Sequence, residues 1–102
     1  MEAELNRLEK KLTKEVLWLY ILSSLKKEPM HAYALRKKIF EKFNFLPGEV
    51  SAYVVLYKLQ SRGFVSTKKD ENKVNYSITQ KGEKLFEQAK KNIIEKQKQI
   101  FG

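Results

Sequence analysis

The segment from Val16 to Leu22 constrains the fold more than any other part of the chain, because all seven of its residues are apolar. A helix that is apolar all the way round must be covered on more than one side. The chain has 102 residues, enough for one domain and too few for two with separate cores. One side of this helix is therefore expected to face the core of its own chain and another to face a partner. The run is too short to cross a bilayer, so no membrane association is predicted.

Apolar residues at helical spacing predict further helices at both ends of the chain. They form narrow seams over residues 2–12 and 80–100, and neither seam has an obvious partner within so small a chain. We therefore predict an N-terminal helical extension over 1–12 and a C-terminal dimerisation helix over 80–102. Trp18 is either part of this interface or a packing residue of the chain's own core. The predicted dimerisation residues are Leu5, Leu8, Leu12, Trp18, Phe86, Ala89, Ile93 and Ile100.

Between the two ends, the sequence predicts two more helices and a hairpin. The helices cover about 31–43 and 49–62, and the turn between them contains Pro47 and Gly48. Gly63 stands at the C-terminal cap position. Two β-rich runs, 64–67 and 74–78, flank the polar stretch 68–73, which is expected to be the hairpin tip, and Thr79 is the expected N-cap of the last helix. This order predicts one domain over 1–102, mainly α with a small β-hairpin (α+β): a winged helix-turn-helix.

The charge of the chain is positive and unevenly distributed. Lys and Arg number 21 against 12 Asp and Glu, which gives a net charge of +9. Residues 26–81 hold twelve basic and five acidic side chains, whereas residues 1–25 and 82–102 are nearly balanced. A concentrated positive charge is the electrostatic footprint expected of phosphate binding. The alternative is an ordinary solubilising surface, which is the interpretation that we favour for the lysines of the C-terminal tail.

The composition also argues against several classes of protein. The chain has no Cys and one His, His31, so a disulfide framework, a thiol nucleophile and the common zinc sites are not expected. No glycine-rich phosphate loop and no signal-peptide pattern are present. We therefore expect a cytoplasmic protein that is not an enzyme and that holds no metal or cofactor.

Three motifs in order resemble the PadR family of transcriptional regulators. Residues 29–35, PMHAYAL, are similar to the family's P-M-H-G-Y-E-L. Residues 51–59, SAYVVLYKL, followed by GFV at 63–65, resemble S-L-Y-P-x-L-x-R-L and G-L-I, with Val54 in place of Pro and Lys58 in place of Arg. Residues 76–82, YSITQKG, are close to Y-x-I-T-x-K-G. Val50 departs from the small residue usual before Ser51, and the resemblance covers about residues 14–90.

The resemblance implies a homodimeric repressor that binds double-stranded DNA. It also implies that the terminal helices form the dimer interface, where some members of the family bind a small hydrophobic effector. Helix 49–62 is then the recognition helix in the major groove, and the wing 64–78 lies on the backbone or in the minor groove. Two half-sites would lie about 34 Å apart, one helical turn of DNA. The predicted DNA-binding residues are Ser51, Tyr53, Val54, Tyr57, Lys58, His31, Tyr33, Lys37, Lys68, Lys69 and Lys73.

Two other functions remain open at this point. The first is a non-specific architectural DNA-binding protein, which would share the salt dependence of a regulator but not its sequence preference. The second is a winged helix used as a protein-interaction module, with an incidental basic surface. For Ser51, a role at the start of its helix is as reasonable as a contact with DNA.

Overall fold

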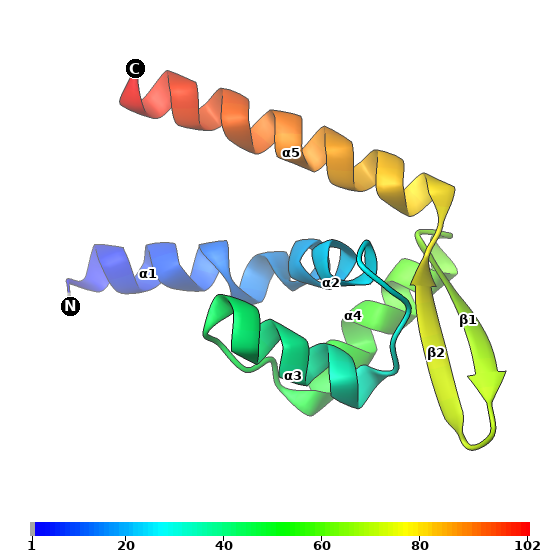
Figure 1. Ribbon diagram of the computed structural model, residues 1–102. Helices are drawn as coiled ribbons and strands as arrows, with labels where there is room; N and C mark the ends of the chain where they lie inside the picture. Colours follow the sequence, from blue (N-terminus) through cyan, green and yellow to red (C-terminus); the bar gives the residue numbers. More distant parts are fainter. Residues whose placement is uncertain (1) are drawn as a thin grey trace.

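The computed structural model describes residues 2–102, so Met1 of the predicted extension 1–12 lies outside the described residues. Figure 1 shows a group of helices and a hairpin from which a long C-terminal helix leads away, with both chain termini on the side opposite the hairpin. The helices are α1 (Ala3–Leu12), α2 (Leu17–Leu25), α3 (Ala32–Phe43), α4 (Glu49–Ser61) and α5 (Gln80–Phe101), and a 3₁₀ turn, η1 (Lys14–Val16), joins α1 to α2. The hairpin consists of β1 (Val65–Asp70) and β2 (Lys73–Ile78).

Helix α2 lies at the centre of the molecule and contacts α3, α4 and α5 as well as β2. Its side chains Ile21 and Leu22 are completely buried and pack in one core with Leu35 of α3 and Leu56 of α4. The structure thus confirms the prediction that a helix apolar on all sides is covered on more than one side. Much of that cover comes from its own chain.

The hairpin corrects one prediction. Its strands pair antiparallel from Val65 with Ile78 to Asp70 with Lys73, so residues 68–73 are not the tip, and Lys68, Lys69 and Lys73 lie within the strands. Only Glu71 and Asn72 form the turn, and Glu71 takes a positive φ, of 56°. Backbone hydrogen bonds between the two strands hold their polar ends together. Because such bonds do not depend on the side chains, these ends show no alternation of apolar and polar residues in the sequence.

The end of α4, the root of the hairpin and the start of α5 form one compact joint. Gly63 ends α4 with a φ of 82°, a conformation that favours glycine. The Thr79 hydroxyl donates to the carbonyl oxygen of Gly63 at 2.6 Å and accepts from the backbone N–H of Gly82 at 3.0 Å. Thr79 is therefore confirmed as the N-cap of α5, whereas Gly63 directly follows Arg62, the C-cap of α4. Together these residues fix the direction in which α5 leaves the hairpin.

Candidate nucleic-acid interface

The start of α3 is held beside the hairpin by backbone hydrogen bonds. The N–H of Met30 donates to the carbonyl oxygen of Tyr76 at 3.1 Å, and the N–H of Tyr76 donates to that of Met30 at 2.9 Å. His31, the next residue, is the N-cap of α3, and its side chain makes no capping hydrogen bond. The first N–H groups of a helix carry partial positive charge and favour an anion such as a phosphate.

Helix α4 presents five of the eleven predicted contact residues on its open surface. The Arg36 Nε atom donates to the carbonyl oxygen of Pro47 at 3.0 Å, which anchors the turn before the helix. Gly48 is the N-cap, so Ser51 lies inside the first turn of α4 and does not occupy the capping position. The five residues that the sequence selects here are all exposed: Ser51, Tyr53, Val54, Tyr57 and Lys58.

Three elements converge on one hollow of about 310 Å³ between α3, α4 and the hairpin. Four of the predicted DNA-binding residues line it: His31 and Tyr33 from the start of α3, Tyr53 from α4, and Lys73 from β2. Burial raises the pKa of the Tyr76 hydroxyl, which also lines the hollow, and the neighbouring Tyr53 adds to that rise. The hollow thus combines a helix N-terminus, a lysine and tyrosine hydroxyls, all of which can donate to phosphate oxygens.

The remaining predicted residues lie elsewhere. Lys37 on α3 and both Lys68 and Lys69 on β1 are exposed but do not line this hollow. Lys58 lies on the flank of α4, beside Trp18 and Leu85. The acidic residues of the hairpin, Asp70 and Glu71, line a neighbouring hollow with Glu28, and His31 and Lys73 line that hollow as well.

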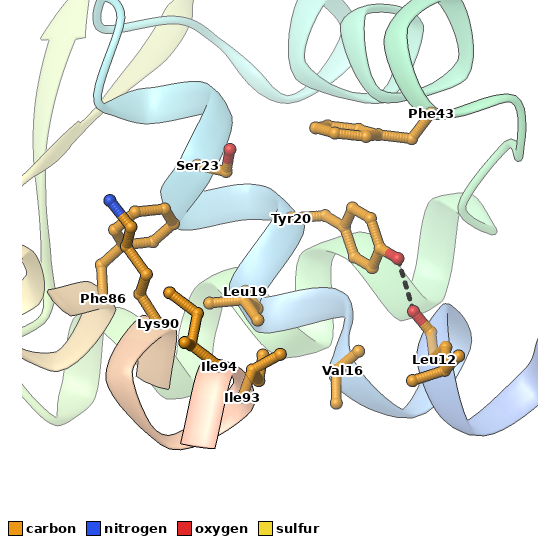
Figure 2. Close-up of a pocket in the computed structure, with 10 residues that line it drawn as sticks. All are labelled: Leu12, Val16, Leu19, Tyr20, Ser23, Phe43, Phe86, Lys90, Ile93 and Ile94. Atoms are coloured by element: carbon orange, nitrogen blue, oxygen red, sulfur yellow. Dashed lines mark hydrogen bonds between the residues drawn. The ribbon is translucent and has the colours of Figure 1, made fainter. Parts of the chain in front are cut away.

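A second, more apolar groove of about 520 Å³ lies between α2, α5 and the end of α3. Figure 2 shows Ile93, Ile94 and Phe86 of α5 facing Leu19 of α2. Of the predicted dimerisation residues, Leu12, Phe86 and Ile93 line this groove. Leu5 and Leu8 continue its apolar character along α1, where both are half exposed.

The other predicted dimerisation residues are placed differently. Ile100 is exposed near the end of α5, and Ala89 is half-buried on the same helix. Trp18 packs against the core on the side of α4 and does not line the groove.

Tyr20 also lines this groove, although no sequence pattern singles it out. Its hydroxyl donates to the carbonyl oxygen of Leu12, and its ring meets those of Phe43 and Phe45 edge to face, each at 4.9 Å between centroids. Figure 2 shows Tyr20 between Leu12 and Phe43. The only feature of the sequence that pointed to this position was that α2 is apolar on all sides. The aromatic neighbours of Tyr20 come from the end of α3 and the turn after it, more than twenty residues away, and are not visible as a pattern in the sequence.

Among the described residues, no group of His, Cys, Asp and Glu could hold a metal ion. None of the helices in residues 2–102 is long and apolar enough to cross a membrane.

Comparisons with solved structures identify similar folds. The chain is 30% identical to a protein of Thermoplasma acidophilum, with 88% of this chain and 91% of that chain covered and a TM-score of 0.76. A PadR family transcriptional regulator from Eggerthella lenta has a TM-score of 0.84 at 19% identity, covering 94% and 88% of the two chains. A transcriptional regulator from Clostridium thermocellum has a TM-score of 0.79 at 21% identity, covering 98% and 94%. The last two likenesses show the winged-helix fold alone.

Sequence comparison establishes the family. A search of curated proteins finds no significant match. The model of the transcriptional regulator PadR-like family matches residues 21–88, within the stretch of about 14–90 that carries the three motifs. Because this match spans well over half of the chain and agrees with the fold, the chain belongs to the PadR-like family of transcriptional regulators.

Proposed function

We propose that this protein is a homodimeric repressor that binds double-stranded DNA in a sequence-specific manner. Helix α4 enters the major groove, and the hairpin lies along the backbone or the minor groove. Repression is steric, because a dimer bound at a promoter excludes the polymerase. The observation that carries this proposal is the convergence of His31, Tyr53 and Lys73 on one hollow beside the exposed face of α4.

The charge distribution also supports DNA binding by α3, α4 and the hairpin. Seven of the nine excess positive charges fall within residues 26–81, which include α3, α4 and the hairpin. Phosphate contacts by lysines release counterions, so such a surface binds DNA with strong salt dependence. Asp70 and Glu71 of the hairpin line a neighbouring hollow, which shares His31 and Lys73 with the first hollow but does not include Tyr53.

Self-association is supported by the exposed apolar side chains at the two ends. Leu5, Leu8 and Leu12 of α1 are each about half exposed, at 51%, 50% and 54%. On α5, Ile93 and Ile94 are 51% and 41% exposed. Large apolar side chains gathered in this way mark an interface, and a second copy of the chain offers a matching surface under two-fold symmetry. A dimer would place two copies of α4 to contact two half-sites.

The experiment that tests the proposal is selection of a binding sequence from a randomised duplex pool. Fluorescence anisotropy then measures the affinity for the selected duplex across a range of salt concentrations. We expect a two-fold symmetric sequence and a steep loss of affinity with salt. The Lys73→Gln variant should lower the slope of log affinity against log salt by about one per protomer. Lys84→Gln, which removes the same charge from the exposed side of α5, is the matched control and should keep the slope.

Two outcomes point to other functions. Steep salt dependence without a selected sequence would favour an architectural DNA-binding protein. To test for a protein-interaction module, Lys58 and Lys69 are both changed to Glu. A DNA-binding regulator loses duplex binding on this change, whereas an interface built on apolar contacts persists.

A further inference from the structure

The outward face of α4 carries an apolar ridge, made of Val50, Val54 and Tyr57. These residues are spaced by four and three positions, so their side chains lie along one side of the helix. They are 77%, 46% and 70% exposed, although all three are large hydrophobic residues. The core of the chain does not account for them, because the buried stripe of α4 consists of Ala52, Leu56 and Leu59. The ridge therefore faces a partner or solvent.

The polar composition of the same part of α4 is also unusual for a helix that contacts bases. Residues 49–57 contain no Arg, Lys, Asn or Gln. Arg and Lys make the common paired hydrogen bonds to guanine, and Asn and Gln make those to adenine. The first two turns of α4 therefore lack the side chains that identify purines by paired hydrogen bonds. Along the ridge itself, they offer two valine side chains and a tyrosine ring.

One feature of the major groove is apolar, namely the C5-methyl group of thymine. A helix with its side chains is about 10–12 Å wide, close to the roughly 12 Å width of that groove. Residues 26–81, which include α4, hold seven excess positive charges, and this excess favours a polyanionic partner over an apolar protein partner. Tyr53, a candidate phosphate contact on the same two turns of α4, lines the hollow that Lys73 also lines.

We infer that Val50 and Val54 are specificity-determining residues that select thymines in each half-site by van der Waals contact with their methyl groups. This inference rests on the proposed function, because it requires that α4 enters the major groove. It specifies which chemical feature of the operator is recognised. A half-site read in this way contains thymine at the positions that face Val50 and Val54.

Replacement of thymine by deoxyuridine tests this inference, because it removes the methyl group and keeps the base pair. Each thymine of the selected duplex is replaced in turn, and the affinity is measured by anisotropy. We expect a loss of about fourfold at one or two positions in each half-site, the effect of exposing one buried methyl group. If no position shows a loss above experimental error, the inference is wrong.

Variants then connect the sensitive positions to named side chains. In Val50→Ala or Val54→Ala, the effect of deoxyuridine at the contacted position should fall below twofold, as in a double-mutant cycle. Both valines are exposed and alanine has the highest helix propensity, so these variants are expected to fold. Val55→Ala is the matched control, because it is the same change on the same helix at a side chain that faces Trp18. This variant should keep the full deoxyuridine effect.

The outcomes separate this inference from the proposed function. If the duplex pool yields no sequence at all, both are overturned. If a sequence is selected but both valine variants keep the full deoxyuridine effect, then only the assignment of thymine contacts to Val50 and Val54 is overturned.

Discussion

The ammonium nitrogen of Lys81 on α5 lies 2.7 Å from the carbonyl oxygen of Arg62, the C-cap residue of α4. The same nitrogen lies 4.8 Å from the centre of the Phe64 ring. Lysine near the end of a helix satisfies a carbonyl group that lacks a partner within the helix and interacts favourably with its dipole. This pair ties the end of α4 to the start of α5, so the helix proposed to contact DNA and the helix proposed to form the dimer share one joint.

Replacing Lys81 by Met should weaken that joint without disrupting the core. The variant loses the hydrogen bond to Arg62 and the contact of the charge with Phe64 but keeps an aliphatic chain of similar length. We expect the free energy of unfolding to fall by about 1 kcal/mol, because the interactions are exposed to solvent. Urea unfolding followed by circular dichroism measures the change. Lys84→Met on the same helix should stay within about 0.5 kcal/mol of the wild type, and equal losses in both variants would argue against the pairing.

Gly82 is required for a different reason, since there is no room for a side chain at its position. A Cβ atom there would lie 2.1 Å from the carbonyl oxygen of Phe64 and 2.9 Å from Cγ1 of Ile78. The first neighbour is backbone and cannot move aside alone. Gly82→Ala should therefore cost about 2 kcal/mol, despite the better helix propensity of alanine, and lower the melting temperature by roughly 10 °C.

A glycine control separates this clash from a general effect of adding a methyl group. At Gly48, a Cβ atom would meet only Ser51, with its nearest atom at 3.5 Å, which is an ordinary contact. Gly48→Ala should therefore lower the melting temperature by clearly less than Gly82→Ala does in the same thermal scan. The reverse order would contradict the close approach of α5 to Phe64.

Tyr20 predicts a pH dependence at the alkaline end. Burial, and secondarily the nearby charge of Glu9, raises the pKa of the Tyr20 hydroxyl above its ordinary value of 10.0. A group whose pKa is higher in the folded state stabilises the fold below its unfolded pKa, and this stabilisation is lost as the pH rises through the folded value. Stability should therefore fall above pH 10.

The Tyr20→Phe variant identifies the group responsible. At neutral pH it should lose about 1 kcal/mol, because the hydrogen bond to the carbonyl oxygen of Leu12 is removed. Above pH 10 its stability should fall less steeply than that of the wild type, because it has one tyrosine fewer to ionise. Urea unfolding at several pH values measures both effects, and the lack of cysteine removes thiol chemistry as a complication. Parallel curves for the two proteins would contradict this assignment.

The helices of this fold could be predicted from the sequence because each carries a local signal. Apolar spacing marked α3 and α4, Gly63 marked the end of α4, and Thr79 marked the start of α5. The hairpin was less visible, because β1 continues through Lys68 and Lys69, whose side chains are exposed on both faces of the wing. Backbone hydrogen bonds extend these strands, and such bonds leave no trace in side-chain hydrophobicity.

The candidate site could be predicted only in part, since its geometry depends on contacts between distant segments. The residues His31, Tyr53 and Lys73 were selected one at a time, and nothing in the sequence indicated that they share a hollow. Helical periodicity predicted that Lys58 lies outside the buried stripe of α4. It did not predict that Lys58 lies on the flank of the helix beside Trp18. Tyr20 was missed because its aromatic neighbours, Phe43 and Phe45, lie at the end of α3 and in the turn that follows, far from Tyr20 in the sequence.

The proposed dimer makes a prediction about Ile93, which is half exposed beside the groove between α2 and α5. Ile93→Glu should leave the core of the protomer intact, because that core is formed by other residues. It should weaken self-association at least a hundredfold, because a two-fold interface loses this apolar contact twice, about 3 kcal/mol in all. Sedimentation equilibrium measures the change. Lys91→Glu, on the same helix but outside the groove, is expected to remain dimeric, and a variant of Ile93 that still sediments as a dimer would contradict an interface at this groove.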